Sequence, residues 1–112
     1  MQTTDFRSFA EFYPYYLSEH SNSTNRALHF AGTTGVIALA VTATLTMQPL
    51  LLLGMPVCGY GFAWVGHFMV EHNRPATFTY PRWSLMGDFR MYFEIWRGLL
   101  GGQGVVIPQR SS

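Results

Sequence analysis

The sequence predicts an all-α fold, in which a two-span helical hairpin crosses a membrane and two amphipathic interfacial helices flank it. Residues 27–70 contain no Asp, Glu, Lys or Arg, and this run is long enough for two helices of roughly 20 residues each to cross a bilayer. Hydrophobic residues make up 48% of the 112-residue chain and charged residues 12%, about half the usual charged share. We therefore expect residues 1–112 to form one small integral membrane domain.

The first predicted helix covers residues 5–20 and carries aromatic side chains on one face. Helical spacing groups six residues near this face: Phe6, Phe9, Tyr13, Tyr16, Leu17 and His20. The mixture of charged and aromatic residues is typical of a helix that lies in the membrane interface. An aromatic stripe packed on a protein core is an equally good interpretation, and the two interpretations are compatible.

The first span is predicted at residues 25–47, after a polar break at residues 21–25 that is rich in helix-capping residues. Small residues fall close to one of its faces, where they allow a neighbouring helix to approach closely in lipid: Gly32, Gly35, Ala38 and Thr42. Gln48 and Pro49 mark the turn. The second span is predicted at residues 50–72.

The last helix is predicted at residues 84–100, where Ser84 can cap its start. Its apolar face carries Leu85, Phe89, Tyr92, Phe93, Trp96 and Leu100, and its charged side carries Arg90, Glu94 and Arg97. This division predicts a second amphipathic interfacial helix. Asp88 is expected to pair with Arg90 or to cap the helix.

Charge sets the predicted topology and excludes some partners. Arginines flank the hairpin on both sides and the connection near residue 48 has no charge, so the positive-inside rule places both chain ends on the cytoplasmic side. A net charge of +1 without a basic run argues against a nucleic-acid partner.

Cys58 is the single cysteine, which excludes a disulfide framework. A soluble bundle with a very apolar hairpin stays open, because the mean hydropathy is only +0.10.

The four histidines are expected to gather at one membrane face, because a hairpin places the start of its first span beside the end of its second. His29 lies at that start, His67 and His72 lie at that end, and His20 precedes the first span. His67 and Glu71 are about 40° apart around a regular helix, whereas His72 points elsewhere. Two or three histidines with a carboxylate are typical of non-haem Fe(II) sites, although three histidines also suit zinc. Glu71 is a candidate ligand, base or partner that orients a histidine.

Asn73 and Arg74 follow the histidines directly and are candidate substrate-binding residues. The Arg74 guanidinium could hold a substrate carboxylate through two hydrogen bonds. An anchor to lipid headgroups is an equally good interpretation of Arg74.

Four sequence runs occur in a fixed order: EFYPYYLSEH at 11–20, NRALHFAGT at 25–33, GYGFAWVGHFMVEHNRPATFTYP at 59–81 and WSLMGDFRMY at 83–92. Together they resemble the 2-hydroxy fatty acid dioxygenase family, whose characterised fungal member acts in phytosphingosine breakdown. The resemblance implies a multi-helix membrane protein that uses Fe(II) and dioxygen. The implied reaction is the α-oxidation of a 2-hydroxy fatty acid to the acid with one carbon fewer. The family's essential histidines carry over onto His20, His29 and His67.

We therefore predict an iron enzyme whose site lies at the cytoplasmic face of a bacterial inner membrane or endoplasmic reticulum. The predicted catalytic residues are His20, His29, His67 and Glu71, and the predicted metal ligands are His20, His29, His67 and His72. The acyl chain is expected along the aromatic side of the second span, with Tyr60 and Trp64 as substrate contacts. A homo-oligomer is compatible with this prediction.

Two other classes of protein stay open. In a haem-binding membrane protein, His29 and His67 would be axial ligands across the hairpin. In a non-enzymatic interaction protein, the aromatic and small residues would pack against the helices of a partner.

Overall fold

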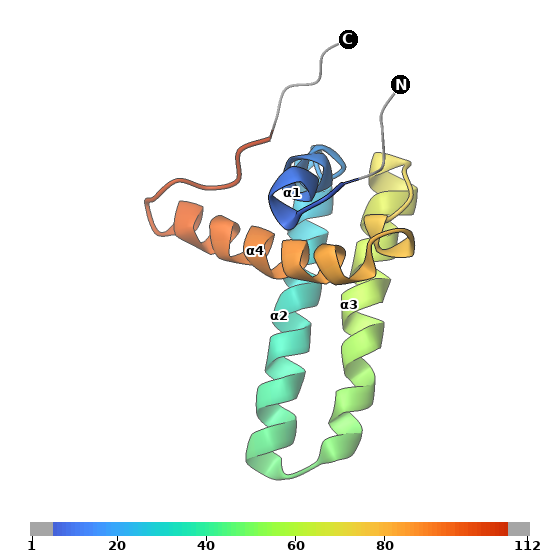
Figure 1. Cartoon of the computed structure of the whole chain (residues 1–112). Helices are drawn as coiled ribbons and strands as arrows, with labels where there is room; N and C mark the ends of the chain where they lie inside the picture. The colour runs from blue at the N-terminus through green and yellow to red at the C-terminus, as the bar shows by residue number, and fades with distance from the viewer. Residues whose placement is uncertain (1–5, 108–112) are drawn as a thin grey trace.

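A computed structural model describes residues 6–107, and within that range every regular element is a helix. The elements in chain order are α1 (Phe9–Ser18), α2 (Ser23–Thr46), the short 3-10 helix η1 (Pro49–Leu53), α3 (Gly54–Trp64), the π-helix η2 (Val65–Glu71), the short 3-10 helix η3 (Ala76–Phe78) and α4 (Pro81–Leu99). Figure 1 shows α2 and α3 as the two legs of a hairpin, with α1 and α4 lying across its open end. The predicted all-α hairpin is confirmed. Residue 5, where the first helix was expected to begin, lies outside the described residues.

Both legs of the hairpin are long and apolar enough to cross a membrane. Ser23–Thr46 has 24 residues with a mean hydropathy of 1.5, and Pro49–Glu71 has 23 residues with a mean hydropathy of 1.4. At 1.5 Å per residue, either leg exceeds the roughly 30 Å of a bilayer's hydrocarbon core. Only 22% and 6% of these apolar stretches are buried inside the protein. A core hairpin of a soluble bundle would be mostly buried, so the exposure favours a lipid-facing surface.

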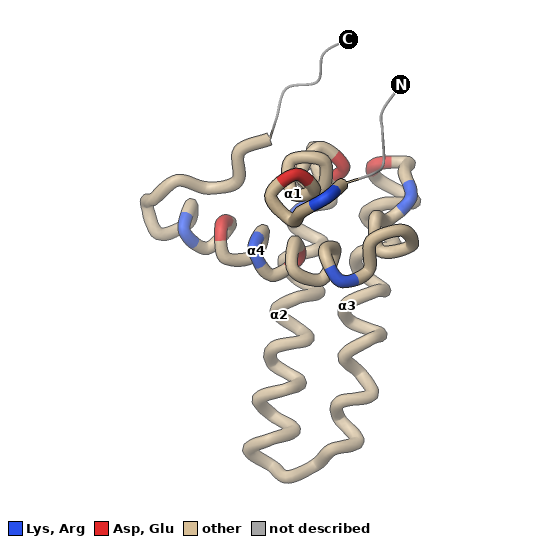
Figure 2. Tube along the Cα trace, viewed as in Figure 1, with Lys and Arg blue, Asp and Glu red and all other residues tan. Residues whose placement is uncertain are grey.

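Charged residues occupy one end of the molecule. Figure 2 shows Arg, Asp and Glu gathered at the open end of the hairpin, where Arg26 lies in the first turn of α2 and Glu71 ends η2, whereas residues 27–70 of the two legs carry none. At the opposite end, large apolar side chains lie bare, with Leu45 79% and Leu50 78% exposed. The division follows the long axis of the hairpin, as expected for a protein that enters a bilayer with its turn first.

The protein core lies between α1 and α4 rather than between the legs. Phe12, Tyr13, Tyr16 and Leu17 of α1 are buried, and Met91 of α4 packs into the same cluster. The aromatic stripe of the first helix therefore packs on a protein core, which is one of the two interpretations that the sequence supports.

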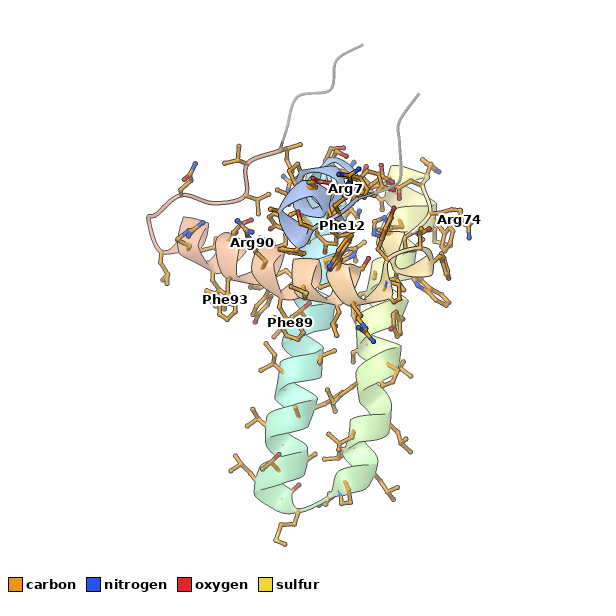
Figure 3. The ribbon with its side chains drawn as sticks, viewed as in Figure 1. Arg7, Phe12, Arg74, Phe89, Arg90 and Phe93 are labelled. Atoms are coloured by element: carbon orange, nitrogen blue, oxygen red, sulfur yellow. The ribbon has the colours of Figure 1, made fainter. Side chains whose placement is uncertain are left out.

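Helix α4 divides its side chains between this core and the hairpin side. In Figure 3, Phe89 and Phe93 point from α4 towards the turn of the hairpin, whereas Arg90 lies on the side of α1. Leu85, Phe93 and Leu99 are exposed. The apolar side of α4 therefore faces the turn of the hairpin, at the level where the charged residues end. This arrangement is expected of a helix that lies in a membrane interface.

The second leg is not a regular α-helix throughout. It begins as the 3-10 helix η1 with Pro49 in its first turn and ends as the π-helix η2, after which His72 has a left-handed backbone with φ of 60°. A Cβ on Gly66 would lie 1.8 Å from Oδ1 of Asn25, so glycine is required for α2 to approach this close. Such π-helical segments are frequent at functional sites.

Candidate metal centre

Three histidines from three separate elements meet at the open end of the hairpin. His20 follows α1, His29 lies in the second turn of α2, and His67 lies in η2. Their ring centroids are 4.3, 4.5 and 4.9 Å apart, and their exposed fractions are 1%, 6% and 2%. One ring nitrogen from each lies within 4.8 Å of the others. The predicted convergence of these three residues is therefore present in the structure.

Each of the three imidazoles is held through its Nδ1 atom. The acceptors are the carbonyl oxygen of Tyr16 for His20 at 2.7 Å, the carbonyl oxygen of Asn25 for His29 at 3.1 Å, and Oδ1 of Asn73 for His67 at 2.7 Å. Because a carbonyl oxygen only accepts, Nδ1 carries the proton in all three rings. A neutral imidazole protonated at Nδ1 keeps its lone pair on Nε2. The Nε2 atoms are thus prepared as ligands.

The arrangement of the Nε2 atoms fits a metal ion. Nε2 of His20 lies 3.1 Å from Nε2 of His29, and with both protons on Nδ1 neither atom can donate to the other. Two nitrogens that each lie about 2.1 Å from one ion in neighbouring coordination positions are roughly 3.0–3.4 Å apart. Burial, and then the charge of the other two histidines, lowers the pKa of His20 well below its usual value. The ring is therefore neutral and available to a cation.

Glu71 and His72 lie outside this group of three. The Glu71 carboxylate accepts hydrogen bonds from the backbone N–H of Asn22 and, at 3.3 Å, from Oγ of Ser21. It therefore joins the end of η2 to the start of α2. His72 is exposed, because its left-handed backbone turns it away from the interior.

Asn73 and Arg74, two of the four residues predicted to contact substrate, are engaged elsewhere. The Asn73 amide accepts from His67 and donates through Nδ2 to the carbonyl oxygen of Glu19 at 3.1 Å. Asn73 therefore positions a histidine. Arg74 is exposed, and its guanidinium lies over the ring of Phe78 at 5.2 Å, which is a cation–π contact.

A cavity of about 220 Å³ adjoins the three histidines and reaches between α2, α3 and α4. Its walls are mostly apolar and include Val36, Met55, Pro56, Tyr60, Trp64 and Phe89. Tyr60 and Trp64 thus line the cavity, where the sequence placed substrate contacts. They are also 49% and 42% exposed, so this wall is shared with the outer surface of α3. The cavity has polar ring nitrogens at one end and a hydrocarbon-like wall beyond them.

Sequence reasoning missed a polar wall of the same cavity. The Asp88 carboxylate accepts a hydrogen bond from the hydroxyl of Tyr16, and the Tyr16 ring stacks on His20 with centroids 4.2 Å apart. Burial raises the pKa of Asp88 to about 7. Burial, and then the nearby Asp88, raises the pKa of Tyr16 well above its usual value. The hydroxyl therefore keeps its proton and donates.

The expected pairing of Asp88 with Arg90 is wrong. Nε of Arg90 lies 3.5 Å from the Glu94 carboxylate. Residues i and i+2 of a helix do not face each other, so the spacing of Asp88 and Arg90 in the sequence already argues against this pair. Ser84 and Asp88 are one helical turn apart, and this spacing indicates that both side chains lie on the same face of α4.

The fold and the site define a class: small membrane-type helical proteins able to hold a metal ion. The features that define it are a largely apolar helical hairpin and three buried, pre-oriented histidines beside an apolar cavity. Residues 6–100 match the family described as 2-hydroxy-palmitic acid dioxygenase Mpo1-like, and the chain belongs to this family. The predicted family is thereby confirmed, and its description as a dioxygenase supports an enzyme. No curated protein and no solved structure showed a significant match.

Proposed function

We propose that this protein is a membrane-embedded, Fe(II)-dependent dioxygenase that converts 2-hydroxy fatty acids into fatty acids with one carbon fewer. The convergence of one ring nitrogen from each of the three histidines beside an apolar cavity carries the proposal. The description of the matched family supports this class of substrate and reaction.

His20, His29 and His67 would hold the iron. Three ligands leave open coordination positions, as in other non-haem iron enzymes. When bound, Fe(II) supplies the activation of dioxygen and a Lewis acid for the 2-hydroxy acid. The overall change, R–CH(OH)–COOH + O₂ → R–COOH + CO₂ + H₂O, balances without a further reductant when the lost carbon leaves as carbon dioxide.

The protein's own residues position the substrate and exclude water. The acyl chain would lie along the apolar wall that includes Tyr60 and Trp64, which places the acid group at the histidines. Because α3 faces lipid in this proposal, the acyl chain of the substrate would enter the cavity laterally from the bilayer. Charged residues lie at the same end as the site (Figure 2), and the positive-inside rule assigns that end to the cytoplasm.

The test begins with the metal content of protein purified anaerobically in mild detergent. We expect about one iron per chain, and its loss in a His67→Ala variant. Oxygen uptake with 2-hydroxypalmitate should yield the 15-carbon acid and should also be lost. His72→Ala is the matched control, because His72 is an exposed histidine at the same end of the hairpin, and it should keep both iron and turnover.

Other outcomes would identify other functions. Zinc in place of iron would indicate hydrolysis, because three histidines also form zinc sites. A Soret band would indicate haem, although the His20 ring, 4.3 and 4.5 Å from the other two, occupies the space that a porphyrin would need. A folded protein without metal would indicate an interaction protein and would refute the proposal.

A further inference from the structure

The cavity has a polar wall on α4 that the histidine site does not use. Ser84 and Asp88 lie one helical turn apart, and both line the cavity that the three histidines close. Ser84 is buried, and its Oγ has no hydrogen-bond partner in residues 6–107. A buried hydroxyl without a partner is costly. A ligand with a polar head could supply that partner.

Comparison with a second tyrosine–carboxylate pair shows what is unusual about Asp88. Tyr13 donates to Glu94 at 2.5 Å, much as Tyr16 donates to Asp88. Both pairs join α1 to α4.

The two carboxylates differ in their remaining partners. Glu94 also lies 3.5 Å from Arg90 and 3.9 Å from Arg97. Asp88 makes no ion pair within residues 6–107, and Tyr16 bonds only its Oδ1 atom. Asp88 lines the cavity, and within residues 6–107 its second oxygen is left to accept a hydrogen bond from a ligand there.

We propose that Asp88 and Ser84 form the subsite for the polar head of the substrate. Asp88 accepts a hydrogen bond from the 2-hydroxyl group, and Ser84 donates one to the carboxylate. This inference rests on the proposed function and deepens it, because it assigns the selection of 2-hydroxy acids to two residues of α4.

The geometry places this subsite beside the metal centre. Tyr16 bridges the two, since its hydroxyl bonds Asp88 while its ring stacks on His20 at 4.2 Å. A head group held by Asp88 therefore lies next to the histidines.

The same geometry makes the subsite selective. A site that hydrogen-bonds a substrate hydroxyl rejects an analogue without it, because the buried acceptor is left unpaired. The raised pKa of Asp88, about 7, fits a carboxyl group whose hydrogen bond from Tyr16 only partly offsets the effect of burial.

The experiment measures the affinities of the metal-loaded protein for 2-hydroxypalmitate and palmitate in detergent, for example by tryptophan fluorescence, since Trp64 lines the cavity. Wild type should prefer the hydroxy acid. Asp88→Ala should weaken the binding of 2-hydroxypalmitate by roughly 10- to 100-fold and leave the binding of palmitate unchanged. Glu94→Ala is the matched control, because it removes the equivalent acceptor of Tyr13 outside the cavity, and it should keep the wild-type ratio.

Two further variants keep the test decisive if Asp88→Ala fails to fold. Asp88→Asn keeps an acceptor for Tyr16 but turns an N–H donor towards the ligand, and it should reduce the preference for the hydroxy acid. Ser84→Ala removes a hydroxyl that has no protein partner and should weaken both fatty acids by about 3- to 10-fold. Metal content is measured for each variant, because a merely structural effect would lower it.

The two proposals fail in different ways. Folded Asp88 variants that keep the wild-type preference would overturn the subsite while leaving the dioxygenase assignment intact. A wild-type protein that binds both acids equally would overturn the subsite alone, and one that binds neither acid would overturn the proposed function together with the subsite.

Discussion

Asn73 is the most informative residue to change, because its side chain supplies one of the three acceptors that orient the histidines. The other two acceptors are backbone carbonyl oxygens of Tyr16 and Asn25. In Asn73→Ala, Nδ1 of His67 loses its 2.7 Å hydrogen bond and the Glu19 carbonyl loses its 3.1 Å donor. The first loss frees the ligand ring to rotate, and the second loosens α1 from the end of η2.

The expected effect can be estimated from these contacts. Each lost hydrogen bond is worth about 0.5–1.5 kcal/mol, and removing a group that orients a metal-ligating histidine typically costs about 10- to 100-fold in metal affinity. We expect Asn73→Ala to lower iron affinity by that factor, measured by competition with a chelator under anaerobic conditions.

Two neighbouring variants separate the causes. Asn73→Asp keeps an acceptor for His67 but loses the donor to Glu19, so it should bind iron more tightly than Asn73→Ala. Arg74→Ala changes an exposed neighbour and should match wild type. If Asn73→Ala binds iron as tightly as wild type, the orienting role is refuted.

Three further predictions follow from the same structure. Gly66→Ala should destabilise the protein and abolish metal binding, because its Cβ would lie 1.8 Å from the Asn25 side chain. Gly61→Ala, whose Cβ would meet nothing within 4 Å, should do neither. Equal melting temperatures of the two variants would contradict this packing. The folded-state pKa of Asp88 is raised from 3.8 to about 7, so its contribution to stability is complete below about pH 4 and is lost as the pH rises through 7. Asp88→Asn should therefore stabilise the protein more at pH 8 than at pH 5, by about 2–3 kcal/mol, because about two units of the shift lie above pH 5 at roughly 1.4 kcal/mol per pKa unit. Equal melting-temperature gains at both pH values would refute the shift. Removing the metal with a chelator should lower the melting temperature reversibly, because the ion binds only the folded arrangement; an unchanged melting temperature would argue against a site at His20, His29 and His67.

The main features of the fold could be predicted from charge alone. Residues 27–70 lack charged side chains, which required two spans and a turn between them. A hairpin then had to bring His29 and His67 to the same end, and the short break at residues 21–25 kept His20 beside them. No long-range packing knowledge was needed for these steps.

The rest depended on backbone geometry that a regular helical projection does not represent. The projection assumes 100° per residue, whereas η2 is a π-helix and His72 has a left-handed backbone. It placed His72 away from His67, but it did not show that the Glu71 carboxylate bonds Ser21 and Asn22 at the start of α2. The same turn brings the backbone N–H of Asn73 to within 2.9 Å of the His67 carbonyl oxygen. This fold-back delivers the Asn73 amide to the imidazole, and no pattern in the sequence marks it.

The backbone acceptors of His20 and His29 have a consequence for how the site tolerates change. Each carbonyl belongs to the residue four positions earlier, Tyr16 and Asn25, and every amino acid carries the same carbonyl group. Substitution at position 16 or 25 alters a side chain but leaves the acceptor in place as long as the helical turn persists. Mutational robustness is thus built into two of the three ligand orientations, and the third is exposed to loss by a single codon change at Asn73.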